Sequence, residues 1–461
     1  MYLKGKKILI LGLGITGVST IKALYKLGAD VVISDLKKEE ELEKYLKEIS
    51  SYPVELRLGT NDIPLDNIDM IIKSPGILPD IPVLKRAEKA GIEVITDIEL
   101  AYRIMTDNNF IAITGTNGKT TTTTLTGELF KKAGYNTYVT GNIGVGILWK
   151  VANGNKDDVF VIEASSFQLA NTKHFKPKVS LILNITPDHM NWHKSYENYI
   201  NAKKKIFINQ DENDYTILNY DDEILRKIGR DARGQLIWFS TDSILNRGVY
   251  IDEDYIVIND GKTINKIMPY KEVNIPGKHN LQNALGAVSI GWTMGIPFNI
   301  IKDVLSTFEG VEHRIEYVTE IDGVKFYNDS KGTNADASIK AVETLENSII
   351  LIAGGMDKGN EFDDFVKTFE GRVKDLVLLG ETKEKIKKTA LKYNFNNIFM
   401  VDNMKEAVKK SFRLSQKGDK VLLSPACASW DMYENYEVRG RDFKKAVMEI
   451  KGDSDGKEKI R

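Results

Sequence analysis

The feature that most constrains the fold is a glycine-rich turn between a strand-like run and a helical stretch. The apolar run Asn109–Thr114 leads into the turn Gly115-Thr116-Asn117-Gly118-Lys119-Thr120, and a threonine-rich helical segment continues from Thr121. Glycines allow successive backbone N–H groups to surround phosphate oxygens, and the start of the following helix adds a favourable dipole. The order of strand, turn and helix therefore predicts an α/β domain that binds phosphate.

This turn differs from the commonest phosphate loop, GxxxxGK[ST], because the position of the first glycine holds Ile113. It is a shorter GxxGKT sequence. We expect the Lys119 amine to reach the β- and γ-phosphates of a nucleoside triphosphate, and the Thr120 hydroxyl to face Mg²⁺. The alternative is a Gly-Asn turn that caps a helix and binds nothing.

A nucleoside triphosphate needs a metal ion, and two residues that follow strand-like runs are candidate ligands. Glu163 ends the run Val159–Glu163, and His189 follows the run Val179–Ile185. The carboxyl ends of parallel strands are where open α/β sheets bind ligands. Either residue alone would be interpreted as structural, and the phosphate loop is what makes both of them candidates.

A second glycine-rich turn, Gly12–Gly17, follows the first apolar run of the chain, and Asp35 follows it. Its GxGxxG pattern, with an acidic residue about 20 positions on, suggests a dinucleotide, although any nucleotide with a pyrophosphate could use the same turn. A hydride-transferring enzyme would leave the other phosphate loop unexplained. A turn without a ligand is the remaining alternative.

Short apolar runs alternate with helical stretches along most of the chain, which indicates parallel sheets covered by helices. The 461 residues are enough for about three domains. The alternation begins near residue 6, begins again at the phosphate loop and a third time at Ser348–Ala353. The stretch 214–275 is richer in β-branched residues and short turns, so we expect a small antiparallel part there. The predicted fold class is α/β with three domains.

Composition excludes several classes of protein. Lys and Arg number 64 against 65 Asp and Glu, a net charge of −1, whereas a nucleic-acid or acidic-membrane surface needs a large positive excess. The single cysteine, Cys427, cannot form an internal disulfide, which fits a reducing cytosol. No apolar stretch approaches the ~18–20 residues of a membrane span. We therefore expect a cytoplasmic protein that neither binds nucleic acid nor inserts into a membrane. Composition says nothing of oligomeric state, for which our expectation is a monomer.

Together these segments resemble the Mur ligases, the ATP-dependent amide-forming enzymes of peptidoglycan synthesis. The resemblance covers nearly the whole chain, in order. The matching segments are Gly12–Gly17, Thr114–Thr122, Gly141–Gly144, Glu163–Leu169, Asp188–Met190, Ala202–Lys203, His279–Ala284, His313–Arg314, Asn328–Asn334 and Ser424–Ser429. The phosphate loop is shared by the wider superfamily, including folylpolyglutamate synthetases, whereas the last two segments are typical of the members that add D-glutamate.

The resemblance implies an N-terminal Rossmann-like domain over residues 1–105 that binds a UDP-sugar. A central P-loop ATPase-like domain would span 106–311, and a C-terminal Rossmann-like domain over 312–461 would bind the incoming amino acid. The implied substrates are ATP, UDP-N-acetylmuramoyl-L-alanine and D-glutamate. In the family's reaction the L-alanyl carboxylate attacks the γ-phosphate of ATP, and the D-glutamate amine then attacks the acyl phosphate.

Roles for individual residues also follow from the resemblance. The implied catalytic residues are Lys119, Glu163, His189, Lys203 and Lys331. Mg²⁺, as two ions, would be held by Thr120, Glu163, His189 and a carbamate that CO₂ forms on Lys203. The implied ATP contacts are Gly115, Thr116, Asn117, Gly118, Lys119, Thr120, Thr121, Asn280, Asn283, Arg314 and Asp329. The implied UDP-sugar contacts are Gly14, Ile15, Thr16, Asp35, Leu36, Lys37, Ser74, Asn142 and His189. The implied D-glutamate contacts are Thr333, Lys358, Ser429 and Tyr436.

Some positions depart from the family's pattern. Leu36 and Lys37 replace a common Thr-Arg pair, which leaves their contacts with uridine open. Tyr436 stands where Phe is frequent, so a hydroxyl is added to the amino-acid pocket. Lys203 begins a run of three lysines, and the spacing alone does not select it over its neighbours.

The implied reaction needs concentrated positive charge. Bringing a carboxylate within about 4 Å of one phosphate charge costs ~4 kcal/mol at an effective dielectric near 20, roughly a thousandfold in rate. Because the net charge is −1, Mg²⁺ and Lys119 must supply the compensation locally. Three alternatives stay open: a ligase that adds glutamate to folate, a nicotinamide-dependent oxidoreductase built on Gly12–Gly17, and a regulator in which ATP only drives domain closure.

Overall fold

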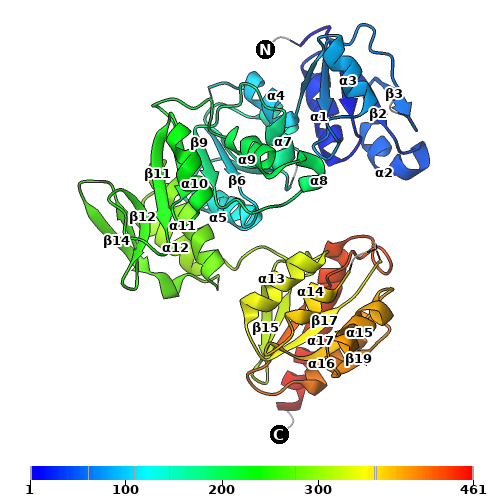
Figure 1. Ribbon diagram of the computed structural model, residues 1–461, viewed down its shortest axis with the longest axis vertical. Helices are drawn as coiled ribbons and strands as arrows, with labels where there is room; N and C mark the ends of the chain where they lie inside the picture. The colour runs from blue at the N-terminus through cyan, green and yellow to red at the C-terminus, as the bar shows by residue number, and fades with distance from the viewer. Residues whose placement is uncertain are drawn as a thin grey trace. The chain divides into compact units, whose positions relative to one another are not determined.

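The computed structural model describes residues 3–60, 62–107, 109–144, 146–275, 277–357, 359 and 361–458. The chain forms two compact units, residues 1–308 and 309–461, drawn from blue to green and from yellow to red in Figure 1. The first unit contains two sheets and the second contains one. Helices cover these mostly parallel sheets, which confirms the predicted α/β fold with three domains.

The N-terminal domain has a five-stranded parallel sheet in the order β3-β2-β1-β4-β5. Its elements are β1 (Lys7–Leu11), α1 (Ile15–Lys26), β2 (Asp30–Asp35), α2 (Glu39–Ile49), β3 (Val54–Leu58), β4 (Met70–Lys73), α3 (Pro82–Lys89), β5 (Glu93–Ile95) and α4 (Asp97–Ile104). Side chains alternate along β1: Ile8 and Ile10 belong to the core under α1, and Leu9 and Leu11 to the core under α3. Since the chain leaves β1 for β2 on one side and β4 lies on the other, the carboxyl end of β1 is a topological switch point, where such sheets bind ligands.

The central domain has a nine-stranded sheet in the order β14-β13-β12-β11-β10-β9-β6-β8-β7. Its strands are β6 (Asn109–Thr114), β7 (Thr137–Gly141), β8 (Val159–Glu163), β9 (Val179–Ile182), β10 (Tyr215–Asn219), β11 (Gln235–Ser240), β12 (Gly248–Asp252), β13 (Tyr255–Asn259) and β14 (Ile264–Pro269). Its helices are α5 (Lys119–Lys132), α6 (Ile147–Asn153), α7 (Ser166–Ala170), α8 (Met190–His193), α9 (Tyr196–Lys204), α10 (Glu223–Ile228), α11 (Lys278–Thr293) and α12 (Phe298–Thr307), with 3₁₀ turns at Gly229–Asp231 and Tyr270–Glu272.

The antiparallel part of the central sheet is smaller than the sequence indicates. Only the pairs β12–β13 and β13–β14 are antiparallel, over residues 248–269. Strands β10 and β11, which fall in the stretch 214–275, instead extend the parallel sheet. Helix α10 connects β10 to β11 as a crossover, the connection that parallel strands need. A strand rich in β-branched residues has the same pattern whether it pairs parallel or antiparallel, so only the connection distinguishes the two arrangements.

The second unit has a six-stranded sheet in the order β15-β16-β20-β17-β18-β19. Its elements are β15 (Glu316–Ile321), β16 (Val324–Asn328), α13 (Ala335–Leu345), β17 (Ile349–Ala353), α14 (Asp363–Lys367), β18 (Val373–Leu378), α15 (Lys383–Lys392), β19 (Ile398–Met400), α16 (Met404–Leu414), β20 (Lys420–Leu423) and α17 (Tyr436–Glu458). The edge pair β15–β16 is antiparallel and the other pairs are parallel. Within the described ranges, no helix is both long and apolar enough to cross a membrane.

A buried carboxylate joins the first two domains. Glu99 on α4 has a fully buried side chain and accepts a hydrogen bond from the Arg103 guanidinium at 2.7 Å. It also accepts hydrogen bonds from the backbone N–H groups of Lys173–Phe175 in the central domain, at 2.9 to 3.1 Å. One side chain thus satisfies three backbone donors of the neighbouring domain.

Glu99→Ala removes this acceptor and leaves Arg103 and three backbone N–H groups without it. We expect the free energy of unfolding of the first unit to fall by about 3–5 kcal/mol, the usual cost of breaking a buried ion pair. A lower midpoint in urea unfolding would report the loss. Glu128→Ala is the matched control, because Glu128 pairs with Lys131 on the surface and such pairs contribute about 0–1 kcal/mol. Equal losses in the two variants would contradict the role given to Glu99.

Candidate active site

The phosphate loop has the backbone geometry that only glycine tolerates. Gly115 lies at φ 158° and Gly118, which begins α5, at φ 82°. A Cβ atom at Gly118 would lie 2.1 Å from the Asn283 side-chain oxygen. Both the left-handed backbone and the close approach of α11 therefore require glycine here. Asn283 is in turn held by Asn280, since its amide donates to the Asn280 side-chain oxygen at 3.1 Å. The two expected adenine-contacting asparagines thus lie beside the loop.

Two lysines converge on one carbonyl of this loop. The Lys119 amine donates to the Gly115 and Thr116 carbonyls, at 2.8 Å each, and the Lys203 amine donates to the same Gly115 carbonyl at 2.8 Å. Lys203 comes from α9 and is 1% exposed. Burial, together with the nearby charge of Lys119, lowers the pKa of Lys203 well below its usual value. The site therefore favours the uncharged amine at Lys203.

Two residues that the sequence analysis did not single out hold the loop in place. The side-chain oxygen of Asn184 accepts a hydrogen bond from the Asn117 backbone at 2.9 Å. The Tyr199 hydroxyl lies 3.0 Å from the Thr116 hydroxyl, and burial raises the pKa of Tyr199 to about 12. The available signals were the position of Asn184 near the end of the Val179–Ile185 run and that of Tyr199 one helical turn before Lys203.

Glu163 offers a buried oxygen at the edge of the sheet next to the loop. It ends β8, which pairs directly with β6, and it is 2% exposed. One carboxylate oxygen accepts from the Asn142 amide at 2.9 Å, whereas the other has no hydrogen-bond partner among the described residues. A buried, unpaired carboxylate oxygen beside a phosphate loop fits a hard cation such as Mg²⁺. Thr120, at the start of α5, is buried in the same loop.

His189 lies at the start of α8 with a left-handed backbone, φ 57°. Its ring is half-exposed, packs on Phe167 with the centroids 4.8 Å apart, and lies 3.3 Å from an Asp188 carboxylate oxygen. His193, one turn later, is buried and lies 2.9 Å from the Ser166 hydroxyl. Burial lowers the pKa of His193 to about 4, so that ring is neutral at neutral pH. Of the two histidines, only His189 faces solvent.

The N-terminal glycine-rich turn lies at the switch point of its sheet. Ser74, which follows β4, packs against it: a Cβ at Gly12 would lie 2.4 Å from the Ser74 hydroxyl. Asp35 accepts hydrogen bonds from the Leu13 backbone at 2.7 Å and the Lys37 backbone at 2.9 Å. The carboxylate thus ties the turn to the end of β2. The remaining expected sugar contacts lie at the same edge: Gly14, Ile15, Thr16, Leu36 and Lys37. Ile15 and Leu36 are exposed, as ligand contacts would be.

The start of α6, four residues after Asn142, contacts the N-terminal domain. The Ser19 hydroxyl on α1 donates to the Gly146 carbonyl at 2.8 Å and accepts from the Trp149 backbone at 3.1 Å. Gly146 also approaches the carbonyl of Ile15, which would lie 3.6 Å from an added Cβ. The start of α6 therefore lies against α1, close to the expected sugar-binding turn.

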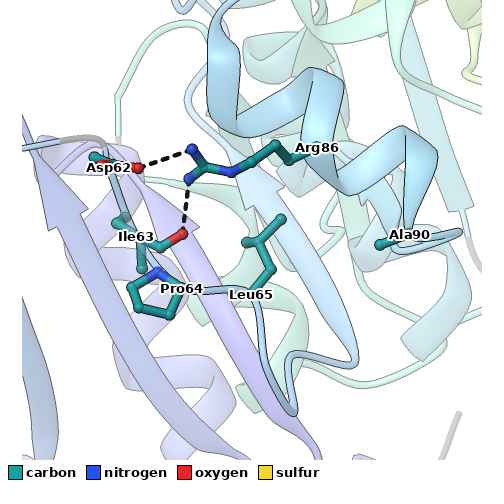
Figure 2. A pocket seen from close by; sticks show the side chains of 6 residues that line it. All are labelled: Asp62, Ile63, Pro64, Leu65, Arg86 and Ala90. Atoms are coloured by element: carbon teal, nitrogen blue, oxygen red, sulfur yellow. Dashed lines mark hydrogen bonds and ion pairs between the residues drawn. The ribbon is translucent and has the colours of Figure 1, made fainter.

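One hollow of the surface lies away from these residues. It has a volume of about 340 Å³ and is lined by Asp62, Ile63, Pro64, Leu65, Arg86 and Ala90. Figure 2 shows its one guanidinium already engaged, because Arg86 donates to the Asp62 carboxylate at 2.8 Å and to the Ile63 carbonyl at 2.9 Å. None of the expected site residues lines it.

In the second unit, Arg314 and Asp329 lie on neighbouring segments. Asp329 accepts from the Ser424 hydroxyl at 2.7 Å and from the Ile315 backbone at 3.3 Å. Burial raises the pKa of Asp329 to about 7, against the opposing effects of Ser424 and Arg314. The guanidinium Nε of Arg314 is buried and has no hydrogen-bond partner among the described residues. An unpaired buried donor beside a buried carboxyl group is a candidate binding position.

Arg439, which the sequence analysis did not single out, joins the two segments expected to bind the amino acid. Its guanidinium donates to the Ser330 hydroxyl and carbonyl at 3.0 and 2.8 Å, and to the carbonyls of Cys427 and Ala428 at 3.1 and 3.3 Å. Cys427 is buried, and burial raises the pKa of its thiol to about 11, which disfavours the reactive thiolate.

Two of the expected acceptor-site residues, Thr333 and Ser429, lie on these joined segments, and Tyr436 begins α17, the helix that carries Arg439. Ser429 is 2% exposed, and the Thr333 backbone donates to the Lys331 carbonyl at 2.9 Å. The Lys331 amine lies 5.9 Å from the Tyr436 ring centre, and the Tyr436 carbonyl accepts from Ser330 at 2.8 Å. Lys358 lies outside the described residues.

Three families match the chain in succession. The MurD-like N-terminal domain of the Mur ligases matches residues 6–96, the Mur ligase middle domain 113–291, and the glutamate ligase domain of the Mur ligases 313–427. A UDP-N-acetylmuramoylalanine–D-glutamate ligase of Caldanaerobacter subterraneus subsp. tengcongensis is 48% identical over 98% of this chain and all of the relative. An enzyme of the same name from Clostridioides difficile is also 48% identical over the same shares.

Two Mur ligases of Thermotoga maritima have the same fold. The UDP-N-acetylmuramate–alanine ligase superposes with a TM-score of 0.60 at 20% identity, over 96% of this chain and 99% of the other. The MurF ligase in complex with ADP superposes with a TM-score of 0.57 at 16% identity, over 95% and 98%. Fold and site together define an amide-forming ligase with a phosphate loop. The chain belongs to the Mur ligase family, in the group of the UDP-N-acetylmuramoylalanine–D-glutamate ligases.

Gly118→Ala tests the geometry of the phosphate loop. The new Cβ must displace the Asn283 amide, so we expect ATP affinity to fall at least about tenfold, which corresponds to only ~1.4 kcal/mol. Calorimetric titration with ATP measures it. Gly134→Ala is the matched control, because Gly134 also has a positive φ, 90°, but nothing lies within 4 Å of its Cβ position. An unchanged ATP affinity in Gly118→Ala would refute the assigned contact.

Proposed function

We propose that the protein joins D-glutamate to UDP-N-acetylmuramoyl-L-alanine with hydrolysis of ATP to ADP and phosphate, in the synthesis of peptidoglycan precursors. The observation that carries the proposal is at one edge of the central sheet. Lys119 and Lys203 share the Gly115 carbonyl there, and Glu163 ends the neighbouring strand with an unpaired oxygen. Such an edge gathers positive charge and metal ligands around a triphosphate. The names of the relatives support the choice of substrates.

The reaction proceeds in two displacements. A carboxylate oxygen of the L-alanyl group attacks the γ-phosphorus, the bond to the β-phosphate oxygen breaks, and ADP leaves. The amine of D-glutamate then attacks the acyl carbon, the bond to the phosphate oxygen breaks, and the nitrogen loses a proton. In this scheme Lys119 and the Gly115–Thr121 backbone hold the phosphates, and Asn280 and Asn283 position the adenine. Arg314 and Asp329 are likewise assigned to ATP binding in this proposal.

Mg²⁺ fits the donors at this edge, and when bound it offsets the repulsion between the attacking carboxylate and the phosphates. Thr120, Glu163, His189 and Lys203 would hold two such ions. The half-exposed His189 ring lies at the start of α8, where it would also approach the UDP-sugar together with Asn142. Hydroxyl, carboxylate and imidazole groups are all suited to divalent cations.

Lys203 suits carbamylation because its environment favours the uncharged amine. Only an uncharged amine attacks CO₂, and the product is an anionic oxygen ligand formed with release of one proton. Burial and the charge of Lys119 lower the pKa of Lys203 in the required direction. The neighbouring Lys204 is an ordinary surface lysine that pairs with Asp231 at 2.6 Å. Burial thus supports Lys203 as the modified residue, a distinction that spacing could not make.

The remaining assignments belong to the same proposal. Residues 1–105, 106–311 and 312–461 would form the sugar-binding, ATP-binding and amino-acid-binding domains. The turn Gly14–Thr16, Asp35–Lys37 and Ser74 would bind the UDP-sugar. Thr333, Lys358, Ser429 and Tyr436 would bind D-glutamate, with Lys331 near the reacting carboxyl group. The protein would act as a monomer in the cytoplasm.

Phosphate release from Mg-ATP tests the function. We expect release only when UDP-N-acetylmuramoyl-L-alanine and D-glutamate are both present, and none with L-glutamate. A colorimetric phosphate assay measures it, and mass spectrometry identifies the amide product. Release that ignores the UDP-sugar would reject the proposal, and folate acceptors would then be the next substrates to try.

Lys203→Ala and Lys204→Ala test the choice of lysine. Loss of a charge-stabilising group at the phosphates should lower kcat by about a hundredfold or more in Lys203→Ala. Loss of a surface ion pair should change it by less than about twofold in Lys204→Ala. Carbon-labelled bicarbonate should give a carbamate signal in the nuclear magnetic resonance spectrum that Lys203→Ala lacks. Equal kinetic effects would show that the wrong lysine was chosen.

A further inference from the structure

A second buried lysine, Lys73, lies at the end of β4 in the N-terminal domain. It is 1% exposed, and among the described residues no carboxylate lies within ion-pair distance of its amine. The amine donates instead to three backbone carbonyls of the turn that follows: Ser74 at 3.4 Å, Pro75 at 3.3 Å and Ile77 at 2.9 Å. One ammonium group thus fixes the curvature of the turn 74–77. Burial lowers the pKa of Lys73 to about 8.

This turn contacts the N-terminal glycine-rich turn directly. The Ser74 backbone donates to the Leu11 carbonyl at 2.8 Å, and the Ser74 hydroxyl lies 3.3 Å from the Gly12 carbonyl. A Cβ at Gly12 would meet both side-chain atoms of Ser74 within 2.9 Å. A shift of the turn 74–77 would therefore displace the Gly12–Gly17 turn as well.

The Lys73 amine also faces the central domain. It lies 5.3 Å from the ring centre of Trp192, within cation–π distance, and Trp192 belongs to the short helix α8 that begins beside His189. Trp192 packs on Phe167 and His193 with centroid distances of 5.0 and 4.5 Å. Lys194, which ends the helix, pairs with Asp80 of the N-terminal domain at 3.5 Å. Helix α8 therefore contacts the segment around β4 at two points.

We propose that Lys73 is a positioning residue for the UDP-sugar: it fixes the turn 74–77 and ties that turn to helix α8. Its four contacts connect the Ser74 side of the sugar site with the helix that follows His189. A neutral side chain of the same length would keep the packing but lose the donors and the attraction to the indole ring. The inference rests on the proposed function, because that function makes the two turns and His189 parts of one substrate site.

Lys73→Met is the first test. We expect the KM for UDP-N-acetylmuramoyl-L-alanine to rise about tenfold or more, the order that lost hydrogen bonds to a charged group produce. The KM values for ATP and D-glutamate should change by less than about twofold, because neither Lys73 nor the turn 74–77 is among the residues assigned to these two substrates. Lys73→Arg, which restores the charge and the donors, should recover most of the affinity. Equal rises in all three KM values, or no recovery with arginine, would overturn the proposal in favour of a structural role.

Lys26→Met is the matched control. Lys26 also links the N-terminal and central domains through acceptors, the Ala152 carbonyl at 2.8 Å and the Asn153 side chain at 2.7 Å, but it lies at the end of α1. Its substitution should leave the KM for the UDP-sugar unchanged. A rise equal to that of Lys73→Met would mean that any lysine between these domains has the effect, and would overturn the assignment.

The single variant Trp192→Leu provides a test that does not depend on the folding of a Lys73 variant. Loss of the aromatic face should raise the KM for the UDP-sugar, and Trp192→Phe should largely retain it. In the double variant with Lys73→Met, the effects should be less than additive, because both remove one contact. Full additivity would overturn the coupling. If the wild-type protein does not use the UDP-sugar, the proposed function is rejected. If the wild-type protein uses it and Lys73→Met has an unchanged KM for the UDP-sugar, only the role of Lys73 is rejected.

Discussion

The carbonyl of Gly115 is the point on which the central site depends. It accepts hydrogen bonds from the amines of Lys119 and Lys203, which come from the loop's own helix and from α9. Two amines at one oxygen cannot both carry a full charge without cost, and the buried one is driven toward its neutral form. This inequality is what the proposed roles of Lys119 in phosphate binding and of Lys203 in carbamylation require. It arises from the depth of burial and not from the residue type, which is lysine in both cases.

Two buried cations of the described residues are satisfied without a carboxylate partner. Lys73 and Arg439 donate to backbone carbonyls and also contact a π face or a hydroxyl. Neither forms an ion pair with a carboxylate within the described ranges. Carbonyl dipoles satisfy the donors without cancelling the charge. A chain with a net charge of −1 can in this way keep positive potential next to sites expected to bind anionic substrates.

The parallel sheets explain how residues far apart in the sequence meet. Thr114, Glu163 and Ile182 end neighbouring strands of the central sheet, so the segments that follow them leave at one edge. The N-terminal sheet repeats the arrangement with the turns after β1, β2 and β4. Short connections after each strand then need to carry only one or two functional side chains. Glycine is required where such connections touch, as at Gly12 against Ser74 and at Gly118 against Asn283.

The sequence by itself determined the phosphate loop, the α/β class, the number of domains and the family. These features depend on the order of strands and helices and on motifs of consecutive residues, and both can be recognised without a structure. It did not determine the extent of the antiparallel part, since β10 and β11 have the composition of strands in either orientation. Lys73 and Arg439 became recognisable only in the tertiary structure, and only the tertiary structure showed that Asn184 and Tyr199 contact the phosphate loop. All four act through contacts with residues distant in the chain or through backbone carbonyls, and the sequence pattern does not reveal such contacts. Burial also decided between Lys203 and Lys204, because desolvation depends on what the fold places around an amine and not on its position in the sequence.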